Sequence, residues 1–245
     1  MQKNNGTILY SASDLVNFLE CEYITVLDLI DLETPLPRAE EDDEAILFQT
    51  KGLAHEASYF EHLKQSVSSY VDIASERLDI DEAFIATLEA MRSGVEIIYQ
   101  GVLSHECFLG HADFLRRINS PSELGNFSYE VVDTKLSRKA KAKYIVQLCF
   151  YSELLAKAQN YEPAMMHLVF GDRREESYRY ADFSRYYFSL KERFKLSVQD
   201  KEFLAYPETC EHCDFCRWQN LCNERWHQDD HLNQVANISR LQIKN

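Results

Sequence analysis

The amino-acid sequence predicts an α/β fold in which a mixed central sheet is flanked by helices. Apolar residues recur at helical spacing over residues 11–92, whereas residues 95–136 are rich in β-branched and aromatic side chains. Residues 141–198 then alternate between helical and extended patterns, as is typical of a sheet covered by helices. We expect one domain over residues 1–245, in four consecutive parts: a helical N-terminal part (1–93), an α/β core (94–200), a cysteine-rich segment (201–224) and a tail (225–245).

Helices are expected to precede the sheet. Ser11, with Asp14 three residues later, predicts the N-terminal cap of a first helix, whose apolar residues continue to Leu29 and which contains Cys21. Two further helices follow, at 46–63 after an acidic stretch at 40–44, and at 81–92.

The strands of the sheet are expected from residue 95 onward. Three extended segments form a meander, at 95–103, 107–115 and 128–136. The remaining elements of the core are a helix at 141–159, strands at 165–170 and 177–180, and an aromatic-rich helix at 183–198.

Composition and charge limit the expected cellular location of the protein and the classes of ligand that it binds. No run of eighteen apolar residues occurs, and the first residues lack the apolar stretch of a signal peptide, so we expect a soluble, cytoplasmic protein with free thiols. The net charge of −14 opposes general coating of a polyanion. One basic segment, Lys135–Lys143, carries five positive charges and no acid. It is either a solvated helix start or a phosphate contact, and its place beside the acidic motif favours phosphate contact.

Four of the seven cysteines lie within thirteen residues near the C-terminus. This density is typical of a shared metal site, and both zinc and an iron–sulfur cluster are compatible with it. A site built on Cys213, Cys216 and Cys222 needs a fourth ligand. Distant Cys21 competes for that position with the nearby Cys210 and with His212.

Carboxylates and a lysine are expected at adjacent strand ends. Asp113 follows Gly110-His-Ala on one predicted strand, and Asp133-Thr-Lys135 lies on the next. Residues two apart on a strand share a face, so Asp133 and Lys135 should project together. Carboxylate oxygens suit Mg²⁺ or Mn²⁺, and Lys135 would orient a water or stabilise a charged transition state.

Two further positions extend this pattern. Gln147 and Tyr151 are four residues apart and therefore lie on one face of the predicted helix, where they could contact a nucleic-acid backbone. His55, on the second predicted helix, offers an imidazole that could complete a metal shell.

These residues form one pattern over roughly residues 11–224, comprising Cys21, His55, Asp113, Asp133-Thr-Lys135, Gln147-x-x-x-Tyr151 and Cys213-x2-Cys216-x5-Cys222. The pattern resembles the RecB-type PD-(D/E)XK nuclease domain, in its iron–sulfur subclass. That subclass includes AddB-type domains and the CRISPR adaptation exonucleases. The match is closest to bacterial RecB-like nucleases that usually continue into a helicase.

The resemblance implies a restriction-endonuclease-like fold and a role for each motif. It implies metal ligation by His55, Asp113, Asp133 and the backbone carbonyl of Thr134. It implies a catalytic set of Asp113, Asp133, Lys135, Gln147 and Tyr151, and a [4Fe–4S] cluster held by Cys21, Cys213, Cys216 and Cys222. Two features depart from the pattern: Cys210 is an extra cysteine, and a long hairpin separates Asp113 from Asp133.

The function we expect is a deoxyribonuclease dependent on Mg²⁺ or Mn²⁺, an exonuclease of DNA repair or end processing. Its partner would be DNA, as single strands or ends, with a separate or fused helicase, because the chain has no Gly-x-x-x-x-Gly-Lys-Ser/Thr motif of its own. The alternative is a catalytically silent DNA-binding or scaffold module that recruits a helicase. An electron carrier is a third, weaker reading.

Overall fold

The computed structural model describes residues 1–245 except 5, 41–42, 201–202, 236–237, 239 and 244–245. Residues 41–42 belong to the acidic stretch expected before the second helix. Residues 201–202 open the expected cysteine-rich segment, and the others after them fall in the tail. These parts of the predictions lie outside the described residues.

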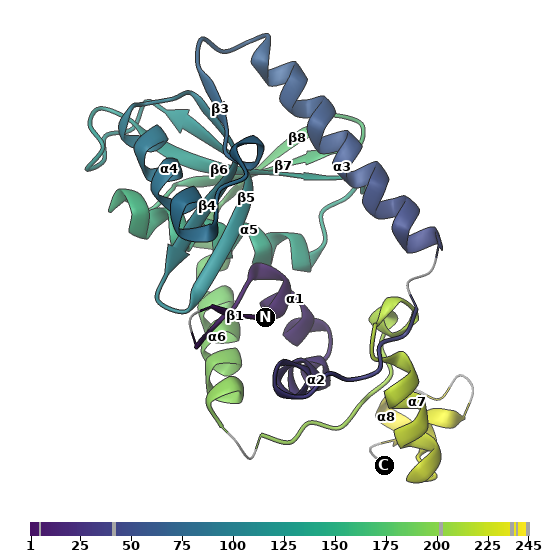
Figure 1. Ribbon diagram of the computed structural model, residues 1–245. Coiled ribbons are helices and arrows are strands. Elements are labelled where there is room, and N and C mark those ends of the chain that lie inside the picture. Colours follow the sequence, from purple (N-terminus) through teal and green to yellow (C-terminus); the bar gives the residue numbers. More distant parts are fainter. Residues whose placement is uncertain (5, 41–42, 201–202, 236–237, 239, 244–245) are drawn as a thin grey trace.

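A six-stranded mixed sheet forms the centre of the molecule (Figure 1). In spatial order its strands are β3 (Tyr70–Asp72), β4 (Ile97–His105), β5 (Phe108–Ile118), β6 (Ser128–Lys135), β7 (Met165–Phe170) and β8 (Glu175–Arg179). The pairs β3–β4 and β6–β7 are parallel, and the other neighbours are antiparallel. The predicted α/β fold and the three-strand meander are confirmed. Strand β3 and an N-terminal hairpin, β1 (Gln2–Asn4) with β2 (Thr7–Leu9), were not predicted from the sequence.

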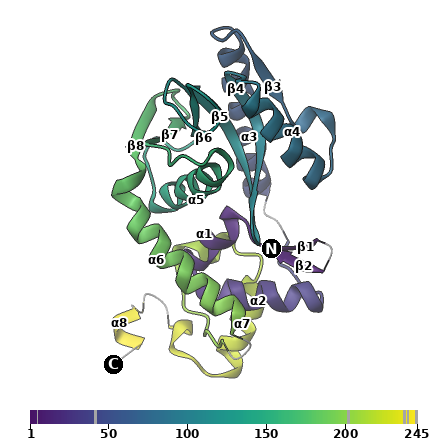
Figure 2. The ribbon, with the colours of Figure 1, turned by 90° about the vertical axis from the view of Figure 1, so that its left-hand side faces the viewer.

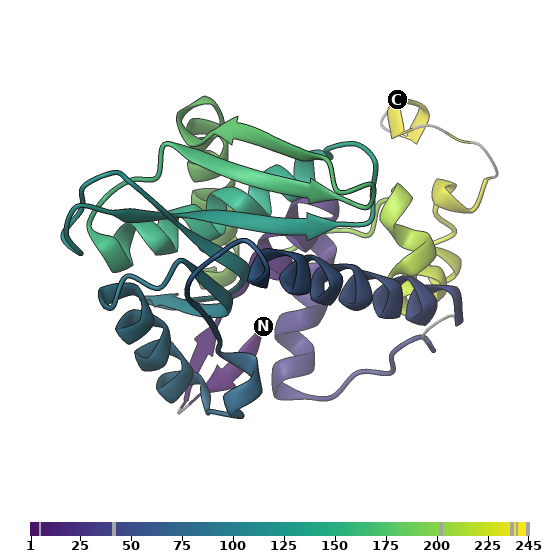
Figure 3. The same ribbon diagram turned by 90° about the horizontal axis from the view of Figure 1, so that it is seen from above.

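Helices cover both faces of this sheet (Figure 3). The long helix α3 (Asp43–Lys64) packs Tyr59 and Phe60 onto one face, against Phe114, Val132 and Val169 of the central strands. The other face is covered by α4 (Ile80–Arg92) and α5 (Ala142–Gln159), with α6 (Tyr180–Gln199) lying on α5. Short 3₁₀ turns at Ala74–Glu76, Glu211–Phe215 and Leu232–Gln234 complete the connections.

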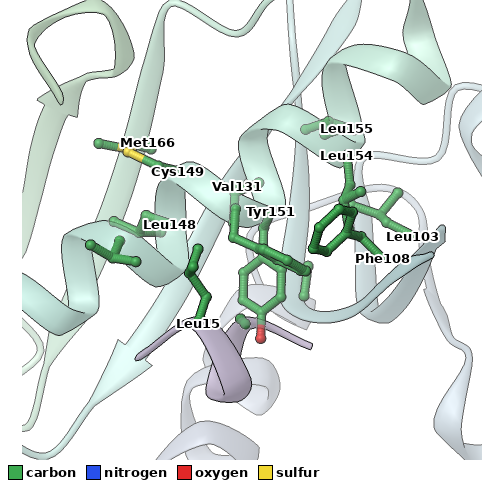
Figure 4. Close-up of a cluster of buried hydrophobic side chains, with 14 of the residues drawn as sticks. Leu15, Leu103, Phe108, Val131, Leu148, Cys149, Tyr151, Leu154, Leu155 and Met166 are labelled. Carbon is green, nitrogen blue, oxygen red and sulfur yellow. The ribbon is translucent and has the colours of Figure 1, made fainter. Parts of the chain in front are cut away.

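The main core lies between the sheet and α5. Ten of its side chains are labelled in Figure 4, and they come from α1 (Ala12–Glu20), from the strands β4, β5, β6 and β7, and from α5. The Tyr151 ring sits among them and leaves no room for a side chain at residue 110, since a Cβ there would lie 2.8 Å from Tyr151 Cδ1. Gly110 is therefore required for β5 to pass beneath α5.

The N-terminal helical region differs from the prediction at one residue. Ser11 and Asp14 form the expected capping box of α1 (Ala12–Glu20). The helix does not continue through Cys21, however, because Cys21 is extended (φ −157°) and separates α1 from α2 (Glu22–Glu33). Cys21 therefore stands at a corner between two helices, where its thiol can leave the helix surface.

The C-terminal segment folds back onto α2, and Figure 2 shows α7 (Gln219–Gln228) beside it. Trp218 is fully buried with Ile24 and Leu27, and its indole N–H donates to Asp28 Oδ1 over 2.7 Å. Arg217 donates to the same oxygen over 2.6 Å. A last short helix, α8 (Arg240–Ile243), ends the described chain. Among the helices that the structure describes, none is long and apolar enough to cross a bilayer.

Candidate active site

Adjacent strands bring Asp113 and Asp133 together. Phe114 of β5 pairs with Val132 of β6, so the two aspartates come next along this antiparallel register. Asp113 Oδ2 accepts two hydrogen bonds from Thr134, from the backbone N–H (2.8 Å) and from the hydroxyl (2.9 Å). The two carboxylates therefore lie close together in space, although a long hairpin separates them in sequence.

Asp133 is fully buried and forms an ion pair with Lys135, with 2.5 Å between Oδ2 and Nζ. Burial, and then the negative charge of Asp113, raise the pKa of Asp133 to about 7. Burial lowers the pKa of Lys135, but Asp133 and Asp113 outweigh that effect and leave it raised. Lys135 therefore stays protonated, and its side chain keeps 20% of its surface exposed.

Helix α3 brings Glu56 close to Asp113, and His55 precedes Glu56 on the same helix. His55 Nε2 is buried and has no hydrogen-bond partner among the described residues. Glu56 is 8% exposed, and its carboxylate accepts a hydrogen bond from the Gln100 amide. Burial, and then the charge of Asp113, raise the pKa of Glu56. The site therefore holds a third carboxylate close to Asp113.

Sequence reasoning missed Glu56, although a signal for it exists. Glu56, Tyr59, Phe60 and Leu63 follow the i, i+3, i+4, i+7 spacing of the buried face of α3. An acid on such a face needs a partner or a function. The partner, Gln100, could not be read from the sequence, because it depends on a left-handed backbone (φ 53°) inside β4.

Helix α5 places the Gln147–Tyr151 pair at the edge of this site. The Gln147 amide donates to the Tyr151 hydroxyl over 3.1 Å, as the four-residue spacing allows. Tyr151 is 7% exposed, and burial, then the charge of Asp133, raise its pKa. The phenol therefore stays protonated beside the aspartates, where it can donate a hydrogen bond.

The described residues contain no three His, Cys, Asp or Glu side chains already arranged around a metal ion. Asp133 is held by Lys135, and Asp113 by Thr134. The donor set nevertheless fits a divalent cation, because Asp133 Oδ1 and His55 Nε2 are both buried without a hydrogen-bond partner in the described part of the chain. Such orphaned polar atoms are costly unless a ligand satisfies them.

The cysteines converge at a second place, about α2 and α7. Cys21, Cys210, Cys213, Cys216 and Cys222 all line one cavity that is walled by apolar side chains. The cavity measures only about 20 Å³, so the thiols would have to move apart around a cluster. The sulfurs of two members, Cys210 and Cys213, are 3.7 Å apart.

Cys210, which the motif pattern does not require, lies among the other thiols and contacts two of them. Hydrogen bonds from Cys21 and then Cys213 lower the pKa of the Cys210 thiol. Cys107 and Cys149 lie outside this group, and Cys149 is buried beside Met166. The structure thus gathers five thiols where the motif pattern needs four.

A model of the PD-(D/E)XK nuclease superfamily matches residues 17–223. The matched range contains every side chain of the candidate site and all five clustered cysteines. The chain belongs to the PD-(D/E)XK nuclease superfamily.

Members of the PD-(D/E)XK superfamily are generally metal-dependent phosphodiesterases. In this PD-(D/E)XK protein the six-stranded mixed sheet is consistent with a restriction-endonuclease-like fold. Asp133-Thr-Lys135 on β6 has the spacing of the acid–x–lysine element in the superfamily's name.

Two other comparisons are less informative about this PD-(D/E)XK protein. The solved structures that match it include "Crystal structure of SSO0001", with 16% sequence identity, a TM-score of 0.37, and coverage of 91% of this chain and 89% of that chain. A likeness at that level carries no conclusion about fold or substrate. A search of curated proteins found no match.

Proposed function

We propose that the protein is a RecB-like deoxyribonuclease that hydrolyses phosphodiester bonds with Mg²⁺ or Mn²⁺, acting as an exonuclease in DNA repair or end processing. The observation that carries this proposal is the buried Asp133, ion-paired with Lys135 and adjacent to Asp113. A buried acid with a raised pKa beside a lysine is typical of a catalytic site and is costly as a purely structural device.

In this proposal Asp113, Asp133, His55 and the backbone carbonyl of Thr134 hold the cation. When bound, the cation would acidify a water and offset charge on the scissile phosphate. Lys135 contributes a positive charge from the protein itself, and its ammonium stabilises the additional negative charge of the transition state.

Tyr151 and Gln147 position the substrate in this proposal. The Gln147 amide orients the Tyr151 hydroxyl, and burial keeps that hydroxyl protonated, so it can donate to a phosphate oxygen. The substrate is DNA, as single strands or ends. A helicase, separate or fused, would supply unwound strands, because the chain has no nucleotide-binding loop motif.

The test is cleavage of end-labelled single- and double-stranded DNA by anaerobically purified protein with Mn²⁺. Asp133→Asn should reduce the rate on the order of 1,000-fold, because it removes a ligand of a cation that contributes several kcal/mol to the transition state. Asp81→Asn, an exposed acid of α4, is the matched control. Equal rates for these two variants would reject the nuclease.

One observation favours the second candidate, a silent DNA-binding or scaffold module. The Lys135 ammonium is paired with an Asp133 oxygen that a divalent cation would need. An ion pair that only stabilises the fold would have the same arrangement. Under this reading the protein would bind DNA, and Asp133→Asn would leave both binding and the absence of cleavage unchanged.

We further propose that Cys21, Cys213, Cys216 and Cys222 bind a [4Fe–4S] cluster. The support is the convergence of these thiols on one cavity from both ends of the chain. Cys21→Ser should abolish the iron content and the brown colour, while Cys107→Ser, which lies outside the cavity, should not. Zinc in place of iron, in colourless protein, would overturn the cluster assignment.

A further inference from the structure

The first half of α3 is much more exposed than its second half. Figures 1 and 3 show it extending beyond the sheet toward the cysteine segment. Large apolar side chains on this half remain open to solvent: Ile46 45%, Leu47 51%, Phe48 55% and Leu53 62%. Exposed aromatic and aliphatic groups at this density, next to a catalytic site, indicate a surface that is covered in use.

One flank of this helix leads directly to the candidate site. Phe48, Lys51, His55 and Ser58 follow one another at i, i+3, i+7 and i+10, so they lie in a row along one side. Phe48 is seven residues from His55, or about 10 Å along the helix axis. Ala45 and Gln49 face another way, lining a cavity with the cysteine segment.

Exposed cations meet the same flank from the sheet. The Arg173 guanidinium donates to Ser58 Oγ over 2.9 Å, which places the β7–β8 turn against the row. Arg174 donates to the backbone carbonyl of Arg138 over 2.8 Å, which joins this turn to the β6–α5 loop. The two loops expose five cations: Arg138, Lys139, Lys141, Arg173 and Arg174.

We propose that this flank, with the two cationic loops, is the path of a single DNA strand as it leaves the scissile phosphate, and that Phe48 stacks on an unpaired base. The inference rests on the proposed function, because the candidate site with His55 and Asp133 defines which end of the path holds the scissile phosphate. Charge carries the choice of partner, since these cations stand out on a chain of net charge −14.

The geometry of the row also favours a single strand over a duplex. Asp133 is fully buried, so a phosphate must come down to the sheet to reach it. An aromatic ring on the helix beside cations on the neighbouring loops is an arrangement that can hold unpaired bases and their phosphates together.

The test measures binding instead of cleavage, so that it stands apart from the nuclease assay. Affinity for a labelled single strand is measured by fluorescence anisotropy in the Asp133→Asn background, with and without Phe48→Ala. We expect Phe48→Ala to weaken binding about 5- to 150-fold, as for loss of one stacked base. Leu53→Ala, equally exposed but roughly 140° around the helix, is the control and should have no effect.

Three other outcomes of the binding experiment would overturn the proposal. An unchanged affinity in Phe48→Ala removes the stacking contact, an equal loss in Leu53→Ala indicates nonspecific apolar binding, and an equal loss with duplex DNA rejects the single-strand assignment. Arg173→Ala should reduce the salt dependence of binding by about one phosphate contact, whereas Arg185→Ala on α6 should not. A binder that fails to cleave would refute the proposed nuclease while leaving the path intact.

Discussion

Thr134 donates both its backbone N–H and its hydroxyl to one oxygen of Asp113, over 2.8 and 2.9 Å. The hydroxyl bond joins β6 to β5 and fixes the carboxylate that stands beside Asp133. Because a hydrogen bond to a charged group contributes about 1.5–3 kcal/mol, we expect Thr134→Val to reduce the cleavage rate about tenfold or more. Thr134→Ser should restore most of the rate at an unchanged melting temperature. A valine variant as active as the serine variant would show that this hydroxyl does not position Asp113.

Glu56 should matter more to cation binding than to the fold. Its carboxylate is buried near Asp113, and both facts raise its pKa, so Glu56→Gln should stabilise the cation-free protein at neutral pH. The same change removes a negative charge near the bound cation, and we expect Mn²⁺ to bind roughly tenfold more weakly. Thermal melts at increasing Mn²⁺ measure both effects. Glu61→Gln, on the exposed side of α3, is the control, and an identical response from the two variants would contradict the prediction.

Trp218 should hold the cysteine segment in place whether or not a cluster is bound. Trp218→Phe keeps the buried ring but removes the N–H that donates to Asp28, so we expect the free energy of unfolding to fall by about 1.5–3 kcal/mol. Trp226→Phe removes a hydrogen bond to the uncharged carbonyl of Pro207 and should cost less. Urea unfolding of the two variants, together with proteolysis between residues 203 and 228, measures the difference. Equal costs would mean that the charge of Asp28 contributes nothing.

Stability should depend on pH through a polar network on the sheet face that α3 partly covers. His167 contacts Glu130 (2.9 Å) and Glu175 (3.3 Å), and Arg116 contacts Glu175. Burial lowers the pKa of His167, but its bonds to Glu130 and Glu175 outweigh that effect and raise it above 6.5. A hydrogen bond from His167, followed in importance by one from Arg116, lowers the pKa of Glu175 from 4.5 to about 2.

The two shifts act at opposite ends of the pH range. The His167 contribution is complete below pH 6.5 and is lost as pH rises through its raised folded pKa. The Glu175 contribution is complete above pH 4.5 and is lost as pH falls toward 2. We expect His167→Gln to flatten the decline of the unfolding free energy above pH 6.5, and Glu175→Gln to flatten the acid limb. Unfolding curves that keep both slopes in the variants would contradict this assignment.

Parts of the fold and of the candidate site could be predicted because they are local in sequence. Ser11 and Asp14 cap α1 through a spacing of three residues, and Gln147 meets Tyr151 through a spacing of four. Asp133 and Lys135 share a strand face for the same kind of reason, and their ion pair follows from it. Cys21 was misplaced on a continuous helix because nothing in its neighbours prevents helix formation, whereas the docked C-terminal segment contacts this corner.

The sequence by itself determined the order of helices and strands, the superfamily pattern and the chemistry of its side chains, because these depend on periodicity and residue type. Only the tertiary structure decided which groups meet. Glu56 faces Gln100 across 44 residues because β4 turns left-handed at one position, and Trp218 reaches Asp28 across 190 residues. Cys210 likewise lies among the other thiols because the segment folds onto α2. Such contacts form through packing of distant segments, whose geometry has no counterpart in local sequence spacing.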